Sequence, residues 1–113
     1  MIKLQHASLE SGRWFKLSLI EQLANIGSEV IRTINWKNKG NKEYSRMAFE
    51  RFLELIYLTV KDPKNIRHLR EITRTRECLI DYFDGNNIYN SNDQIWQRYF
   101  YSFNYAARNK IMD

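Results

Sequence analysis

The stretch AFERFLELIYLTVKDP, residues 48–63, decides the fold that the sequence predicts. Its apolar residues recur at the three- and four-residue steps of an α-helix and cover most of its circumference. Asp62-Pro63 then ends the pattern, because proline has a fixed φ and no N–H group and suits the first position of a new helix. We therefore predict a helix over 42–61, the most buried of the chain, with another helix starting at Pro63.

Three further helices are predicted around this one. An apolar stripe at helical spacing predicts a first helix over 13–36, in which Gly27 is the only glycine within a strong helical pattern. The helix that starts at Pro63 runs to residue 83 or 84 and ends at Gly85. The sequence Ser-Asn-Asp-Gln at 91–94 is typical of a capping box and predicts a fourth helix that reaches about residue 110.

Four helices of roughly 20 residues with short connections favour an all-α fold, an antiparallel up-down-up-down four-helix bundle. The 113 residues fit one domain, 1–113, of ordinary size. Four glycines and one proline are fewer than the turns of a β-sandwich or barrel would require. We find no internal repeat and no low-complexity tract in the sequence.

Several function classes are excluded or disfavoured by what the sequence lacks. The single cysteine, Cys78, excludes an internal disulfide and a cysteine-rich zinc site. No run of 18 apolar residues and no apolar signal-peptide core occurs, so we expect a cytoplasmic protein without membrane contact. There is no glycine-rich phosphate loop, and His68 and Glu71 stand in the reverse order of a di-iron Glu-x-x-His motif. We therefore expect no enzyme activity, no metal and no cofactor, and a half-buried, structural His68.

On the last predicted helix, a second face lies opposite the aromatic stripe that should enter the core. It carries two tyrosines flanked by two arginines at spacings of three, four and three residues: Arg98, Tyr101, Tyr105 and Arg108. Tyrosine and arginine are enriched in protein–protein contacts, so we predict a partner-binding surface and a homodimer or other homo-oligomer. Trp14 and Trp36 are a second candidate surface. Alternatively, the tyrosine rings cover neighbouring loops or stack on nucleic-acid bases.

Positive charge is concentrated in the middle of the chain. The net charge is +5, and residues 31–76 hold 12 Lys/Arg against 5 Asp/Glu, a net of +7. The sequence therefore predicts one basic end or side, which would attract RNA, DNA or an acidic protein. Its residues would be Lys37, Lys39, Lys42, Arg67, Arg70 and Arg74. No helix-turn-helix spacing, zinc finger or RNA-recognition motif is present, so nucleic-acid binding is the alternative hypothesis.

Arg76 falls within the apolar face predicted for the third helix. Because a buried guanidinium is costly unless it is paired, we predict a buried ion pair with a carboxylate on a neighbouring helix. The candidate partners are Glu29, Glu50 and Glu54. A functional arginine in a pocket between helices is the other interpretation.

Two stretches, WFKLSLIEQLANIGSEV at 14–30 and AFERFLELIYLTVKDP at 48–63, resemble small uncharacterised prokaryotic helical-bundle proteins. The predicted architecture is also similar to that of the HEPN class. That class includes RNases of toxin–antitoxin systems and partners of small nucleotidyltransferases. The resemblance implies a helical bundle and, as one possible partner, a small nucleotidyltransferase.

The RNase members of the HEPN class carry an arginine and a histidine with four to six residues between them. The positions that would hold the arginine for His68 are Lys61, Asp62 and Pro63, and His6 lies too near the start of the chain. The resemblance therefore implies a non-catalytic member.

Overall fold

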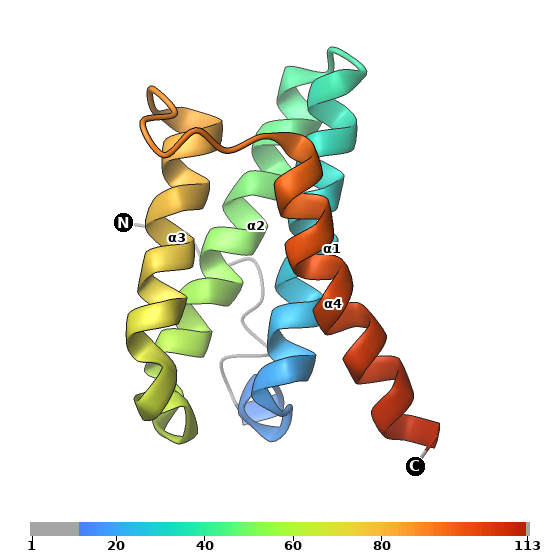
Figure 1. Cartoon of the computed structure of the whole chain (residues 1–113), viewed down its shortest axis with the longest axis vertical. Helices are drawn as coiled ribbons and strands as arrows, with labels where there is room; N and C mark the ends of the chain where they lie inside the picture. Colours follow the sequence, from blue (N-terminus) through green and yellow to red (C-terminus); the bar gives the residue numbers. More distant parts are fainter. Residues whose placement is uncertain (1–11, 113) are drawn as a thin grey trace.

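A computed structural model describes residues 12–112 of the chain. Four long helices and two short 3-10 helices follow one another along it. They are η2 (Trp14–Lys16), α1 (Leu19–Asn38), α2 (Lys42–Lys61), η3 (Pro63–His68), α3 (Leu69–Asp84) and α4 (Asp93–Met112). No strand occurs between residues 12 and 112, so the predicted all-α class is confirmed. Figure 1 shows the four long helices side by side.

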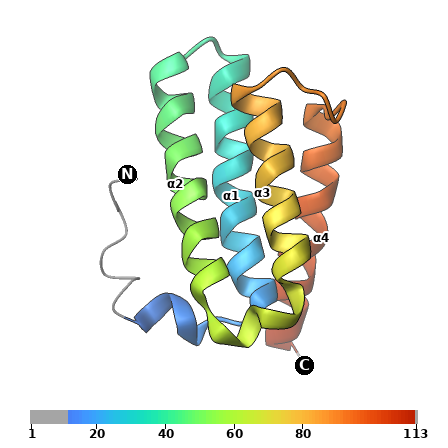
Figure 2. The ribbon, with the colours of Figure 1, turned by 90° about the vertical axis from the view of Figure 1, so that its left-hand side faces the viewer.

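Helix α1 lies between α2 and α4, and α3 packs chiefly against α2 (Figure 2). The core is built from large apolar side chains of all four helices, among them Ile26, Phe52, Leu79 and Phe100. Because α1 has a neighbour on each side, it buries as many residues as α2 does. The prediction that 42–61 would be the most buried helix is therefore wrong.

The first helix begins later than predicted, at Leu19. Ser18 and Glu21 form a capping box, in which Glu21 N donates to Ser18 Oγ at 3.1 Å and Ser18 N donates to Glu21 Oε1 at 3.0 Å. Two orphan N–H groups are thereby satisfied at this point of the chain. The preceding residues therefore form a separate 3-10 turn, and Leu17 between the two elements is extended.

The starts of the last two helices also differ from the prediction. Asp62 caps a 3-10 helix, with Lys64 N donating to its Oδ1 at 3.1 Å, and the α-helix itself begins only at Leu69. Before α4, Ile95 N donates to Asn92 Oδ1 at 2.8 Å, so Asn92 caps the helix. The capping box predicted from Ser91 is wrong, because the backbone N–H of Ser91 bonds Asn87 Oδ1 instead.

Gly27 marks the closest approach of α1 and α4. A Cβ atom at this position would lie 2.7 Å from Phe100 Cβ, which is shorter than two carbon atoms can tolerate. Phe100 is fully buried there. The glycine within the first helical pattern is thus explained by packing, since it lets an aromatic side chain of α4 rest on the backbone of α1.

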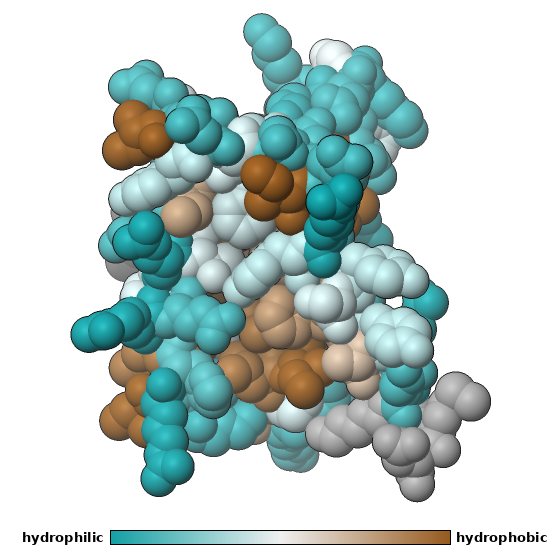
Figure 3. Space-filling model, in the orientation of Figure 1, coloured by the Kyte–Doolittle hydropathy of each residue, from teal (hydrophilic) through white to brown (hydrophobic). Residues whose placement is uncertain are grey.

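Polar and apolar side chains are mixed at both ends of the face shown in Figure 3, and a further apolar group gathers in its lower middle, between α3 and α4. Within residues 12–112, no helix has the length and apolar character needed to cross a membrane.

Candidate functional site

The four residues predicted to bind a partner all lie exposed on α4. Tyr101 and Tyr105 expose 68% and 59% of their surface, and Arg98 and Arg108 are exposed beside them. Within the described part of the chain, none of the four forms an ion pair. We call these residues, Arg98, Tyr101, Tyr105 and Arg108, the α4 surface.

The opposite side of α4 holds this surface in place. Trp96 and Phe100 are buried there, with their rings stacked at a centroid distance of 6.0 Å. Tyr99 OH lies 3.2 Å from Thr75 Oγ1 and donates to Glu71 Oε1 at 3.3 Å, which joins α4 to α3. Burial raises the pKa of the Tyr99 hydroxyl, so it stays a neutral donor at physiological pH. The exposed tyrosines therefore stand on a helix that is packed on its other side.

The α4 surface continues into an open depression at the start of the helix. Gln94 and Gln97 line it together with Arg98 and Tyr101, and its volume is about 350 Å³. Side-chain amides can both donate and accept hydrogen bonds, so the depression adds polar contacts beside the aromatic ones.

The two tryptophans proposed as a second surface behave differently. Trp14 is 2% exposed, and its Nε1 donates to Thr59 Oγ1 at 3.0 Å, so the prediction of a surface Trp14 is wrong. Trp14 belongs to a separate 3-10 turn, and this turn places the indole ring on α2. The predicted continuous helix from residue 13 would have turned the ring away from α2. Trp36 is half-buried and packs edge-on against Tyr44.

The six predicted nucleic-acid-binding residues are all exposed, but they do not form one basic end. Lys37, Lys39 and Lys42 lie at the connection of α1 and α2, whereas Arg67 and Arg70 lie where α2 is connected to α3. Helix α2, with its 20 residues, separates the two groups by about 30 Å at 1.5 Å per residue (Figure 2). The prediction of one basic end is therefore wrong, because the intervening helix carries the two basic segments to opposite ends of the molecule. The alternative, one basic side, stays a prediction.

Lys37 also has partners inside the protein. Its Nζ donates to Asp93 Oδ1 at 2.8 Å and to Tyr82 OH at 3.2 Å, and Asn38 Nδ2 donates to Asp93 Oδ2 at 3.1 Å. Tyr82 OH donates to Asp93 as well. We call these four residues, Lys37, Asn38, Tyr82 and Asp93, the upper network. It joins the end of α1 to the end of α3 and the start of α4.

Charge and burial act against each other in the upper network. Burial alone would raise the pKa of Asp93, but the hydrogen bonds from Lys37, Tyr82 and Asn38 hold it below its ordinary value. Burial would likewise lower the pKa of Lys37, yet its bonds to Asp93 and Tyr82 keep it above the ordinary value. Lys37 is therefore a charged structural residue more than a free phosphate contact.

Arg76 is exposed, so the predicted buried ion pair is wrong. The buried face of α3 follows Ile72, Thr75 and Leu79, and at 100° per residue Arg76 lies about 70° from the middle of that face. Among residues 12–112, no carboxylate forms an ion pair with Arg76. Two of the predicted partners pair elsewhere: Glu29 with Arg32 at 3.0 Å and Glu50 with Arg46 at 3.6 Å. Glu54 is buried on α2.

His68 was expected to be half-buried, but its side chain is exposed as well.

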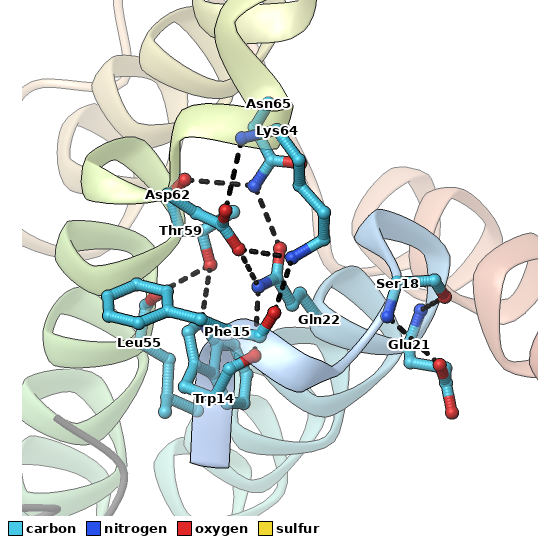
Figure 4. A network of polar contacts seen from close by, with 10 residues as sticks. All are labelled: Trp14, Phe15, Ser18, Glu21, Gln22, Leu55, Thr59, Asp62, Lys64 and Asn65. Carbon is cyan, nitrogen blue, oxygen red and sulfur yellow. Dashed lines mark hydrogen bonds and ion pairs between the residues drawn. The ribbon is translucent and has the colours of Figure 1, made fainter. Parts of the chain in front are cut away.

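A buried polar cluster that the sequence analysis missed lies where η2, α1, α2 and η3 meet (Figure 4). Gln22 is its centre, since its Nε2 donates to Trp14 O at 3.1 Å and to Asp62 Oδ2 at 2.8 Å. Asn65 Nδ2 donates to Gln22 Oε1 at 2.8 Å and to Thr59 O at 3.0 Å. We call these five residues, Trp14, Gln22, Thr59, Asp62 and Asn65, the lower network.

Lys64 closes the lower network toward solvent. Its Nζ donates to Asp62 Oδ2 and, at 3.1 Å, to the carbonyl oxygen of Phe15. Burial would raise the pKa of Asp62, but the hydrogen bonds from Lys64 and Gln22 hold it below its ordinary value. The network satisfies its polar groups internally, so its geometry suits a structural role.

Neither network offers an evident reactive centre. No group of three or more His, Cys, Asp or Glu side chains that could hold a metal ion occurs between residues 12 and 112. Cys78 is half-buried on α3.

No protein-family model, curated protein or solved structure matches the chain. The α4 surface is therefore the best candidate for a functional site, on its own geometry.

Proposed function

We propose that this protein is a non-catalytic helical-bundle module for binding and assembly, which acts through protein–protein contacts of the α4 surface. The observation that carries the proposal is the exposure of Tyr101 and Tyr105 on a helix anchored from behind by Trp96 and Phe100. Rigid, amphipathic aromatic side chains provide contact area at a low cost in conformational entropy. Flanking arginines add hydrogen bonds and cation–π contacts.

We further propose the antiparallel up-down-up-down order for the bundle. In its support, the colours of Figure 1 run upward in α1, downward in α2, upward in α3 and downward in α4. In this order α4 is the last helix of the bundle, and its outer side is open to a partner. We also infer a cytoplasmic location, which the lone Cys78 supports because a reducing compartment does not call for disulfides.

The proposed partner is a second copy of the chain. The spacing of three, four and three residues in the α4 surface is the same in both directions along the helix. An antiparallel pair of α4 helices about a twofold axis would thus set Tyr101 of one copy against Tyr105 of the other. Each arginine would then lie within a turn of a partner tyrosine, in reach for a cation–π contact.

Light scattering coupled to size exclusion tests this proposal on the full chain. We expect the wild type to run at about twice 13.7 kDa and the double variant Tyr101→Ala with Tyr105→Ala at the monomer mass. Because association stabilises the folded subunits by mass action, the wild type should melt at a higher temperature than the double variant, and the difference should shrink on dilution. The control is Tyr57→Ala, which removes an exposed tyrosine from α2 and should leave the dimer intact.

A wild type that is monomeric at all concentrations would refute self-association. Capture of a purified small nucleotidyltransferase by the wild type, but not by the double variant, would then assign the surface to a different protein partner. If the double variant keeps both its mass and its partners, the α4 surface has no role in binding.

Nucleic-acid binding is a second candidate, supported by one observation. Arg67, Arg70 and Arg74 are exposed at helical spacing along η3 and α3, and none forms an ion pair within the described residues. Three phosphate contacts predict a modest slope of affinity against salt concentration. The test is retention of the protein on immobilised single-stranded RNA at low salt. Retention of the wild type that is lost in the triple variant Arg67→Gln, Arg70→Gln, Arg74→Gln would support nucleic-acid binding. No retention of the wild type at low salt would refute it.

A further inference from the structure

A pocket lies in the groove between α1 and α2, near the connection of the two helices. Its volume is about 320 Å³. It is lined by Arg32 and Trp36 of α1 and by Tyr44, Met47, Ala48 and Arg51 of α2. None of these residues belongs to the α4 surface or to the two networks, so the pocket needs an explanation of its own.

The aromatic part of the pocket is a Trp–Tyr pair. The ring centroids of Trp36 and Tyr44 are 4.8 Å apart, and their planes meet at 77°, which is a favourable edge-to-face arrangement. The backbone under Tyr44 is fixed by the N-cap of α2, where Tyr44 N donates to Asn41 Oδ1 at 3.0 Å. Tyr44 is 47% exposed, so its ring is available to a further planar group.

The polar part of the pocket is cationic. No carboxylate is among the six lining residues. Arg32 shares one guanidinium nitrogen with Glu29 at 3.0 Å, whereas Arg51 forms no ion pair with any residue of 12–112. Lys39 adds a third positive charge, with its Nζ 5.1 Å from the centre of the Trp36 ring. An anionic ligand in the pocket would thus meet two guanidinium groups, with the Lys39 ammonium group beside the Trp36 ring.

We propose that this pocket binds a small planar ring that is joined through a sugar to a phosphate group, as in a nucleoside monophosphate. The planar ring stacks on the exposed aromatic surface, and the phosphate accepts hydrogen bonds from Arg51 and Arg32, whose planar forks match phosphate oxygens. A volume near the lower limit of small-molecule pockets, about 300 Å³, favours one ring with one anionic group over a dinucleotide. The pocket is separate from the α4 surface, so the proposal of a nucleotide site does not depend on the proposed function.

An NMR titration of the ¹⁵N-labelled full chain with adenosine monophosphate tests the proposal. We expect the largest shifts at Trp36, Tyr44 and Arg51, with the Trp36 indole N–H as a direct reporter. Adenosine alone and inorganic phosphate alone should each bind at least tenfold more weakly, because each supplies half of the contacts. Equal binding of either half and of the whole would overturn the proposal.

Variants locate the two halves of the site. Arg51→Gln and Tyr44→Leu should each weaken adenosine monophosphate binding about tenfold. The matched control is Arg76→Gln, which removes an equally charged, exposed arginine from α3 and should change the affinity less than twofold. If all three variants bind adenosine monophosphate with the same affinity, non-specific electrostatic attraction holds the nucleotide and the pocket is not its site. The same conclusion follows if chemical-shift changes appear only along η3 and α3.

Discussion

The two ends of the bundle are held by polar networks of similar chemistry but opposite exposure. The lower network is buried: Gln22, Asn65 and Asp62 expose 0%, 1% and 4% of their surfaces. In the upper network, the side chains of Lys37 and Asp93 expose 40% and 28%. Both networks contain an amide, an aspartate and an aromatic donor, and both fasten α1 to segments that are distant in sequence.

This difference indicates that solvent exposure, more than the number of hydrogen bonds, determines how much such a network contributes to the free energy of unfolding. When a partner is removed at the upper end, water can replace it. At the lower end water has little access, so each orphaned group would keep its full desolvation cost, about 1–3 kcal/mol. The lower network should therefore decide whether η2 docks on α2, and the upper network should contribute less to the free energy of unfolding.

The largest effect should come from a comparison of the two amides. Gln22→Ala removes the buried hydrogen bonds that Gln22 makes to Trp14 O, Asp62 and Asn65, although Asp62 keeps Lys64 and Asn65 keeps Thr59 O. We expect the free energy of unfolding to fall by about 3 kcal/mol. Asn38→Ala removes one hydrogen bond at an exposed site and should cost about 0.5 kcal/mol. Urea unfolding followed by circular dichroism measures both. Equal losses for the two variants would contradict the comparison.

Between the two ends, Gly27 controls the contact of α1 with α4. Gly27→Ala gains up to about 1 kcal/mol in helix propensity, but it forces a Cβ atom against Phe100, and overpacking of this kind costs about 1–3 kcal/mol. We expect a net loss of about 1 kcal/mol. The control Ser28→Ala, at the next and exposed position, should stay within about 0.5 kcal/mol of the wild type. A Gly27→Ala protein more stable than the wild type would show that α4 shifts without cost.

Most of the fold was predictable from the sequence, because helix type and number depend on local periodicity. The stretch 48–63 predicted α2 and its end at Asp62-Pro63 correctly. Helix starts were less predictable, since several residues compete for each cap. The pair Ser18 and Glu21 carried a readable capping signal for α1 that was overlooked, and at the start of α4 Asn92 replaced Ser91.

The candidate sites were predictable only where a single helix presents them. Tyr101 and Tyr105 are exposed as predicted, because their direction follows from the period of one helix. The single basic end was wrong, since it depended on where the segments 37–42 and 67–74 meet in space. The lower network was missed for the same reason: Gln22 and Asp62 are 40 residues apart, and no local pattern relates them.

Acid should weaken the lower network in a way that one substitution can isolate. The pKa of Asp62 lies below its ordinary value of 3.8 in the folded state, so its contribution to stability is complete above pH 3.8 and disappears as the pH falls through the folded value. On acidification, we expect the free energy of unfolding to fall further in the wild type than in Asp62→Asn, which has no carboxylate to protonate. Urea midpoints from pH 7 to pH 2 measure this. Identical acid dependence in both proteins would place the titration elsewhere.

The smallest effect should come from the ion pair of the upper network. A double-mutant cycle of Lys37→Met and Asp93→Asn should give a coupling free energy of about 0.5 kcal/mol in low salt, because both side chains retain solvent. At 1 M salt the Debye length falls to about 3 Å, so this coupling should drop by about half or more. The corresponding cycle of Gln22→Ala and Asp62→Asn should hardly change, since a neutral amide bonds a shielded carboxylate there. If salt reduces both couplings alike, solvent reaches the lower network as readily as the upper one, and burial cannot be what separates the two ends.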